Sequence, residues 1–284
     1  MTISELIAGA RERLRHADIP PDEASLDARL LAQHLLGWDT ARMLTSGNDP
    51  ESDGFAERYE ALVRRRVLRE PVAYITGTRE FWNLTFDVSP AVLIPRPETE
   101  GLVEAILAQF PTRDFPLNMV DVCTGSGCIA VAIASERPRA HVLATDLSES
   151  ALAVARRNAA RHGVSAQIDF VCADLMDGIA GTFDAVVSNP PYVPMGARRS
   201  LQPEVKDFEP GMALFGGTEG LDVTQRLVRQ SLGHLNSGGY LMFEFGDGQE
   251  NVIRELISGT VGLTMVDVKA DLRGIPRAAI ARRA

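Results

Sequence analysis

Apolar residues near the start of the chain recur at the three- and four-residue spacing of a helix, at positions 3, 6, 7, 10 and 14. The sequence Thr2-Ile3-Ser4-Glu5 before this pattern is typical of a capping box. Further helices are predicted over residues 22–36, 39–46 and 50–70, separated by Gly37 and by proline at positions 20, 21 and 71. Together they predict a small N-terminal helical bundle.

The pattern changes after the bundle. Residues 81–88 mix aromatic and β-branched side chains, which favours a β-hairpin. The sequence therefore predicts a helical domain over 1–72, a hairpin linker over 73–95 and a larger domain over 96–284.

Helical and strand patterns alternate in the larger domain. Strands are predicted over 118–122, 141–145, 167–171, 183–188 and 240–245, and helices over 97–110, 128–136, 148–162, 221–235 and 249–258. This alternation predicts an α/β fold with a mostly parallel sheet and helices on both faces. Two more apolar runs, 263–268 and 278–281, have no helix between them, so we expect an antiparallel pair at one edge of a seven-stranded sheet.

Composition argues against several classes of protein. The net charge of −9 argues against a general nucleic-acid binder, which usually carries a basic face. No apolar run is long enough to predict a membrane span, and the charged N-terminus is unlike a secretory signal, so we expect a cytoplasmic protein. The three cysteines indicate neither a disulfide framework nor a metal site, and the five histidines show no metal-ligand spacing.

The sequence Asp121-Val122-Cys123-Thr124-Gly125-Ser126-Gly127 joins a predicted strand to a helix. Glycines there let the backbone approach a ligand, and Asp146, at the end of the next strand, can accept ribose hydroxyl groups. The alternatives are a turn without a ligand and an N-cap role for Asp146. Asp121 suits a cationic amino-acid group better than a pyrophosphate, which favours a nucleoside sulfonium donor over a nicotinamide cofactor.

The sequence Ser188-Asn-Pro-Pro-Tyr-Val193 ends a predicted buried strand, because proline cannot continue the hydrogen-bond ladder. A planar –NH2 group is a poor nucleophile with two hydrogens to place. The Asn189 side-chain oxygen and the Pro190 carbonyl can accept those hydrogens, and Tyr192 can pack over the planar group. The alternative is a strand-ending turn without chemistry.

Taken together, Asn189-Pro-Pro-Tyr192, the glycine turn and Asp146 resemble the class I methyltransferases that use S-adenosylmethionine and modify amide or amino nitrogens. Three more stretches are similar to the bacterial peptide chain release factor glutamine methyltransferases. They are REPVAYITG at 69–77, VLIPRPETE at 92–100, and FEP at 208–210 with its following Ala-Leu and Gly-Gly. The resemblance runs from about residue 60 to the end of the chain.

The resemblance implies methylation of the glutamine in the Gly-Gly-Gln motif of class I release factors, with the helical domain helping to dock them. It implies that Asn189 and the Pro190 carbonyl hold the glutamine amide, and that Pro191 and Tyr192 complete the pocket. The implied donor-binding residues are Cys123, Thr124, Gly125, Ser126, Gly127, Asp146, Asp174 and Asn189. The family usually has glycine in place of Cys123, so a positive φ there would cost about 1–3 kcal/mol.

Three other functions stay open. A glutamine of a ribosomal protein would fit the same site. A DNA adenine N6-methyltransferase would need a basic target-reading region, whereas the chain has only two lysines, and no DNA partner is expected. A non-catalytic nucleotide-binding module is the third. The run Arg64-Arg65-Arg66 predicts a solvated helix face or a contact for an acidic partner.

Overall fold

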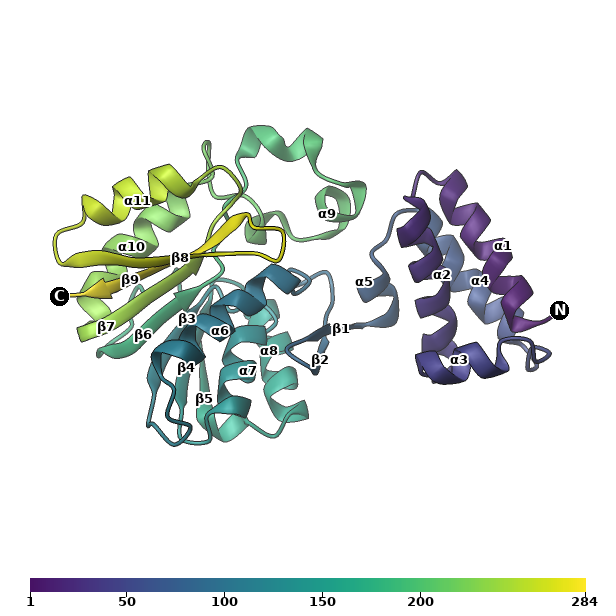
Figure 1. The fold of residues 1–284 in the computed structure, drawn as a ribbon, viewed down its shortest axis with the longest axis horizontal. Helices are drawn as coiled ribbons and strands as arrows, with labels where there is room; N and C mark the ends of the chain where they lie inside the picture. Colours follow the sequence, from purple (N-terminus) through teal and green to yellow (C-terminus); the bar gives the residue numbers. More distant parts are fainter. The chain divides into compact units, whose positions relative to one another are not determined.

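The computed structural model describes residues 1–284, and the chain packs as two compact units (Figure 1). We call residues 1–78 with 202–208 the helical unit, and residues 79–201 with 209–284 the sheet unit. Helix α9 (Pro203–Phe208) therefore packs in the helical unit, although it interrupts the sequence of the sheet unit. The domain boundaries at residues 72 and 95 stay a prediction.

The helical unit contains α1 (Ile3–His16), α2 (Pro21–Leu36), α3 (Thr40–Ser46), α4 (Phe55–Val67) and α5 (Val72–Thr76) in addition to α9. The Thr2 capping box is formed, and Gly37 ends α2 in the left-handed conformation, as predicted. Helix α4 begins later than predicted, because Gly54 at its N-cap has a φ of 72°. The core contains Leu14, Leu31, Phe55 and Tyr59, whose hydroxyl donates to the Ala28 carbonyl at 2.7 Å.

A buried ion cluster attaches α9 to this bundle. The Arg66 guanidinium donates to Asp27 and to Glu204, each at 2.7 Å, and Arg69 donates to Glu204 at 2.8 Å. Arg66 is 3% exposed, so the prediction of a solvated face is wrong for this residue. A buried arginine requires carboxylate partners, and Glu204 supplies one from a distant part of the sequence.

Strands β1 (Thr78–Phe81) and β2 (Leu84–Asp87) form a two-stranded sheet. The two residues between them, Trp82 and Asn83, have φ values of 53° and 55°. Two consecutive positive φ angles are characteristic of the tight type I′ turn that joins paired strands with their natural twist. Residues 78–87 therefore form the β-hairpin that the sequence indicates.

The seven-stranded sheet confirms the predicted fold class. Its strands are β3 (Asn118–Val122), β4 (His141–Asp146), β5 (Ile168–Cys172), β6 (Phe183–Ser188), β7 (Leu235–Glu244), β8 (Leu263–Ala270) and β9 (Pro276–Arg283). Their spatial order is β5-β4-β3-β6-β7-β9-β8. The first five in this order run parallel, whereas β9 is antiparallel to both β7 and β8. The reversal of strand order between β3 and β6 is where open α/β sheets bind ligands.

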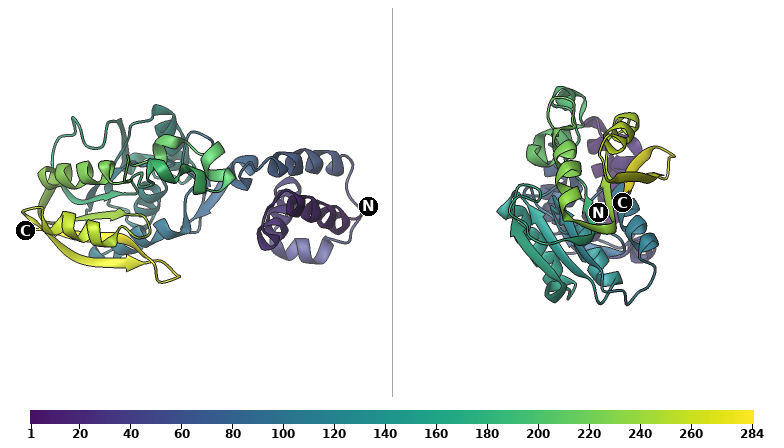
Figure 2. Two further views of the ribbon diagram at one scale, coloured as in Figure 1. Left: turned by 90° about the horizontal axis from the view of Figure 1, so that it is seen from above. Right: turned by 90° about the vertical axis from the view of Figure 1, so that its left-hand side faces the viewer.

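Helices cover both faces of this sheet (Figure 1, Figure 2). Helices α6 (Glu100–Gln109), α7 (Cys128–Glu136) and α8 (Glu149–Arg161) pack on one face, and α10 (Asp222–His234) and α11 (Glu250–Ser258) on the other. Alternate residues of a strand face opposite sides of the sheet. Met119 packs with α6, α7 and α8, and Val120 packs with α10 and α11. The short helices η1 (Pro97–Thr99), η2 (Ser165–Gln167), η3 (Met195–Ser200) and η4 (Gly211–Ala213) complete the fold.

No three histidine, cysteine, aspartate or glutamate side chains gather in the structure so that they could hold a metal ion. All three cysteines are free. None of the helices combines the length and apolar character that crossing a bilayer requires.

Candidate active site

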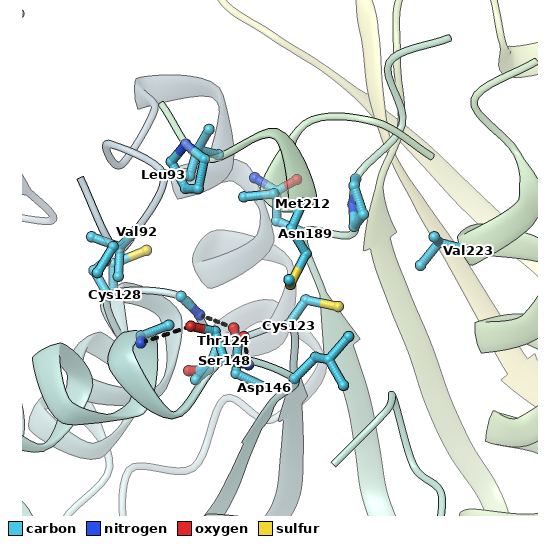
Figure 3. A pocket seen from close by; sticks show the side chains of 18 of the residues that line it. Val92, Leu93, Cys123, Thr124, Cys128, Asp146, Ser148, Asn189, Met212 and Val223 are labelled. Atoms are coloured by element: carbon cyan, nitrogen blue, oxygen red, sulfur yellow. Dashed lines mark hydrogen bonds between the residues drawn. The ribbon is translucent and has the colours of Figure 1, made fainter. Parts of the chain in front are cut away.

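A cleft of about 420 Å³ opens at the carboxyl ends of β3, β4, β5 and β6 (Figure 3). Three parts of the sheet unit line it: the segment 90–99 that leads into α6, the turns that follow the strands, and residues 210–226. Its volume lies within the range of small-molecule sites. The cleft therefore coincides with the strand-order reversal that the topology marks for ligand binding.

The glycine turn forms the floor of the cleft. Cys123, Gly125 and Gly127 have φ values of 60°, 55° and 80°. A side chain at Gly127 would come within 3.0 Å of the Ala155 Cβ atom, so this position needs glycine for space as well as for its φ. Cys123 has a Cβ atom, so its φ of 60° is strained. This is the strain expected where the family usually has glycine.

Asp121 holds this turn through hydrogen bonds. The carboxyl group is fully buried, and its Oδ2 accepts from the Thr124 hydroxyl at 2.6 Å and from the Ala130 amide at 3.2 Å. Its Oδ1 has no hydrogen-bond partner. Burial raises the pKa of Asp121 to about 7. The residue does not line the cleft, and its hydrogen bonds hold the turn.

Asp146 lines the cleft and connects two backbone segments. Its Oδ2 accepts from the Gly125 amide and its Oδ1 from the Ser148 amide, both at 2.9 Å. The N-cap of α8 is Ser148, whose hydroxyl accepts from the Ala151 amide, so the N-cap alternative for Asp146 is wrong. Desolvation by burial raises the pKa of Asp146.

Asp174 lies at the outer side of the same cleft. Its carboxylate accepts from Arg226 at 2.8 Å, and both side chains line the cleft. The next residue, Leu175, has a φ of 57°, and its carbonyl accepts from the buried Thr145 hydroxyl at 3.0 Å. These contacts fix the course of the chain after β5.

The Asn189 side chain lines the cleft opposite the glycine turn (Figure 3). Ser188 attaches the end of β6 to β3, because its hydroxyl donates to the Val122 carbonyl at 2.7 Å. The Asn189 Nδ2 donates to the Thr99 hydroxyl at 2.9 Å. The amide nitrogen is therefore engaged with the protein, and the Oδ1 remains as an acceptor.

Tyr192 reaches away from the cleft lining. Its hydroxyl donates to Glu244 Oε1 at 2.9 Å, and burial raises the pKa of the phenol. The predicted site residues that line the cleft are Cys123, Thr124, Gly125, Ser126, Asp146, Asp174, Asn189 and Pro191. Gly127, Pro190 and Tyr192 do not line it. The roles predicted for all of these residues stay predictions.

A glycine loop, residues 214–220, holds the Asn-Pro-Pro-Tyr turn in place. Val193 donates to the Leu214 carbonyl at 2.8 Å and accepts from the Gly216 amide at 3.0 Å. The Pro191 carbonyl lies against Gly216 and the Tyr192 carbonyl against Gly220, so closely that a side chain at either glycine would overlap them. Glycine is required here because the two backbones touch.

Three polar residues at the site were not predicted from the sequence: Thr99, Glu209 and Glu244. Glu209 accepts from Arg96 at 2.5 Å and from the Ile94 amide at 3.1 Å, which holds the segment leading into η1. Thr99 donates to Glu244 at 2.7 Å. A single acid inside the apolar run Leu241–Phe245 was the available signal for Glu244, which is 2% exposed.

Comparison with known proteins gives consistent results along the chain. Residues 5–77 match the family model described as PrmC N-terminal domain, and residues 100–202 match the methyltransferase small domain. The release factor glutamine methyltransferase of Koribacter versatilis is 42% identical over 288 residues, covering 100% of this chain and 99% of the relative.

Among solved structures, the hMettl16 catalytic domain in complex with the MAT2A 3'UTR hairpin 6 has a TM-score of 0.56 at 18% identity, with 82% of each chain covered. The T. thermophilus 16S rRNA N2 G1207 methyltransferase (RsmC), solved with AdoMet and guanosine, has a TM-score of 0.51 at 16% identity. It covers 72% of this chain and 49% of its own. At these identities the structural likeness shows the fold alone.

Proposed function

The chain belongs to the release factor glutamine methyltransferases, and from this premise we propose that its cleft joins S-adenosylmethionine to a release-factor glutamine. The enzyme transfers the donor's methyl group to the side-chain amide nitrogen (N5) of the glutamine in the Gly-Gly-Gln motif of class I peptide chain release factors. As the N–C bond forms, the methyl–sulfur bond would break with S-adenosylhomocysteine leaving, and the nitrogen would release one proton to water. One observation carries this proposal: the Asn189 side-chain nitrogen donates a hydrogen bond to Thr99. The Asn189 oxygen is therefore left to accept from an incoming amide.

The donor side of the cleft suits a nucleoside with a cationic tail. Gly125 and Gly127 let the backbone come close, while the carboxylates of Asp146 and Asp174 line the cleft as hydrogen-bond acceptors. Cys123, Thr124 and Ser126 complete this side. S-Adenosylmethionine supplies an electron-poor methyl carbon on a good leaving group, so the protein need not activate the donor.

The protein's own contribution is to hold a weak nucleophile. The amide nitrogen of glutamine has a delocalised lone pair and two hydrogens. Asn189 Oδ1 accepts one hydrogen and the Pro190 carbonyl the other, which fixes the direction of the nitrogen. Two prolines in sequence keep the turn stiff, and alignment of this kind can supply about 7–11 kcal/mol of a barrier. Pro191 forms part of the cleft wall, and Tyr192, which does not line the cleft, supports this wall through its hydrogen bond to Glu244.

The direct test is methyl transfer from labelled S-adenosylmethionine to a purified class I release factor, followed by mass spectrometry of its peptides. We expect label on one glutamine, and none when that glutamine is replaced by asparagine. An Asn189→Ala variant should lose about 10²–10³-fold in turnover, about 2.7–4 kcal/mol, as when an oriented polar contact to the transition state is removed. Unchanged turnover of this variant would contradict the amide-holding role.

The same assay separates the other candidates. Label on a ribosomal-protein glutamine with none on the release factor would change the proposed substrate, and label on adenine of DNA would overturn it. Calorimetric binding of NAD without binding of S-adenosylmethionine would indicate a nucleotide-binding module. A release factor acts in translation, so we also propose that the enzyme works in the cytoplasm.

A further inference from the structure

Glu244 lies at the last position of β7 and is almost fully buried, with 2% exposure. Its two carboxylate oxygens accept from hydroxyl groups on two different segments: Oε2 from Thr99 at 2.7 Å and Oε1 from Tyr192 at 2.9 Å. Hydrogen bonds to both oxygens offset the free-energy cost of burying a carboxyl group. Both partners adjoin the site, since Thr99 lines the cleft and Tyr192 belongs to the Asn-Pro-Pro-Tyr turn.

The Thr99 hydroxyl has one proton to donate. The direction of this proton decides whether the Asn189 amide must turn its oxygen or its NH2 group towards Thr99. Because this proton is donated to Glu244, the Thr99 oxygen can only accept from Asn189. The Asn189 group that faces Thr99, 2.9 Å away, must therefore be the Nδ2 amide NH2, which donates the hydrogen bond. A chain of donors runs from Asn189 through Thr99 to Glu244.

We propose that Glu244 and Thr99 are positioning residues that fix the amide orientation of Asn189, so that its Oδ1 and not its Nδ2 faces the acceptor nitrogen. The inference rests on the proposed function and adds what sets the polarity of that site. An inverted Asn189 amide would present two N–H donors to the NH2 group of the substrate amide, which itself offers only hydrogens. The N–H groups of Asn189 would then face the N–H groups of the glutamine amide, and this contact would be repulsive.

Tyr192 extends the same control to the other end of the turn. Its hydroxyl donates to the second oxygen of Glu244, and its ring lies beside Gly246, where an added side chain would come within 3.2 Å of the ring. One carboxylate thus holds residues on both sides of Pro190-Pro191. We expect loss of Glu244 to affect acceptor use more than donor binding, because the donor turn at 123–127 makes no hydrogen bond to it.

The polarity argument distinguishes closely matched variants. Glu244→Gln can donate to Thr99 through its amide, which frees the Thr99 proton for Asn189 and favours the inverted amide. Thr99→Val keeps the shape and removes the relay, whereas Thr99→Ser keeps the hydroxyl. We expect Glu244→Gln and Thr99→Val each to lower kcat for release-factor methylation about 10- to 100-fold, and Thr99→Ser to recover most of the rate.

Three further measurements make the test specific. Calorimetric Kd for S-adenosylmethionine should change less than kcat in every variant, and thermal unfolding should show that each folds. The double variant Glu244→Gln/Thr99→Val should lose no more than the more impaired single variant, because both changes break one relay. Equal rates for Thr99→Val and Thr99→Ser, or full activity of Glu244→Gln, would overturn the inference. If the wild-type enzyme left the release factor unlabelled, the proposed function itself would fail.

Discussion

Replacing Gly216 by alanine tests whether the glycine loop positions the Asn-Pro-Pro-Tyr turn. Gly216 has an ordinary negative φ, so alanine introduces no backbone strain and acts through its volume alone. Its Cβ would overlap the Pro191 carbonyl oxygen and would lie 2.8 Å from the Gly220 carbonyl oxygen. Both obstacles are backbone atoms, which cannot rotate away as the end of a flexible side chain can.

The expected size of the effect follows from this geometry. To restore a separation of about 3.5 Å, the turn or the loop must move by roughly 1 Å. A displacement of about 1 Å at reacting groups can cost about 10²-fold in rate, which is about 2.7 kcal/mol of activation free energy. Overpacking of this kind costs about 1–3 kcal/mol of folding stability. We therefore expect a folded protein with a much slower methyl transfer.

The assay is kcat/KM for methylation of the release factor, with S-adenosylmethionine binding measured in parallel. Donor affinity should be retained, because the glycine turn at 123–127 is a separate segment from the loop. Gly233→Ala is the matched control: this glycine is on α10, with no atom within 4 Å of an added Cβ, and should be neutral or stabilising by about 0.5–1 kcal/mol. Wild-type kcat/KM in Gly216→Ala would refute the positioning argument.

Two predictions concern the donor turn. At Cys123, whose φ is 60°, Cys123→Gly should be more stable than Cys123→Ala by about 1 kcal/mol, the reverse of the usual order, in urea unfolding; greater stability of the alanine variant would contradict the strain. At Asp121, a folded-state pKa of about 7 against 3.8 means that the protonated form stabilises the fold below about pH 4, and that this stability is lost as the pH rises towards 7. The unfolding free energy of the wild type relative to Asp121→Asn should therefore fall by about 3 kcal/mol from pH 4 to 7, and parallel pH curves for the two proteins would rule this out.

The sequence predicted the fold because its signals are local. Alternation of apolar strands with helical patterns specifies a parallel sheet, and the missing helix between 263–268 and 278–281 specified the antiparallel edge. The glycine turn and the Asn-Pro-Pro-Tyr turn were found for the same reason. Glycine allows a positive φ and proline fixes φ at its own position, so both signals are local. Both turns follow strands that adjoin in the sheet, β3 and β6.

The supports of the site could not be found in this way, because each depends on a contact between distant segments. Glu244 follows Thr99 by 145 residues, and Arg66 precedes Glu204 by 138. Nothing near Arg66 distinguishes it from its neighbours Arg64 and Arg65 on the same helix, although it is buried and Arg64 is exposed. Only the tertiary fold determines which charge in a run becomes buried.

These distant supports follow from the chemistry. An amide nitrogen attacking an already activated methyl carbon needs alignment more than it needs a base, so rigidity around Asn189 is where this protein can contribute most. Each support holds a different part of the turn: Ser188 holds its start, Thr99 the Asn189 side chain, and the glycine loop the Pro191 and Tyr192 backbone. Changes that weaken any one of them should therefore lower kcat far more than they lower donor affinity, and equal losses in these two quantities would show that the site is not organised in this way.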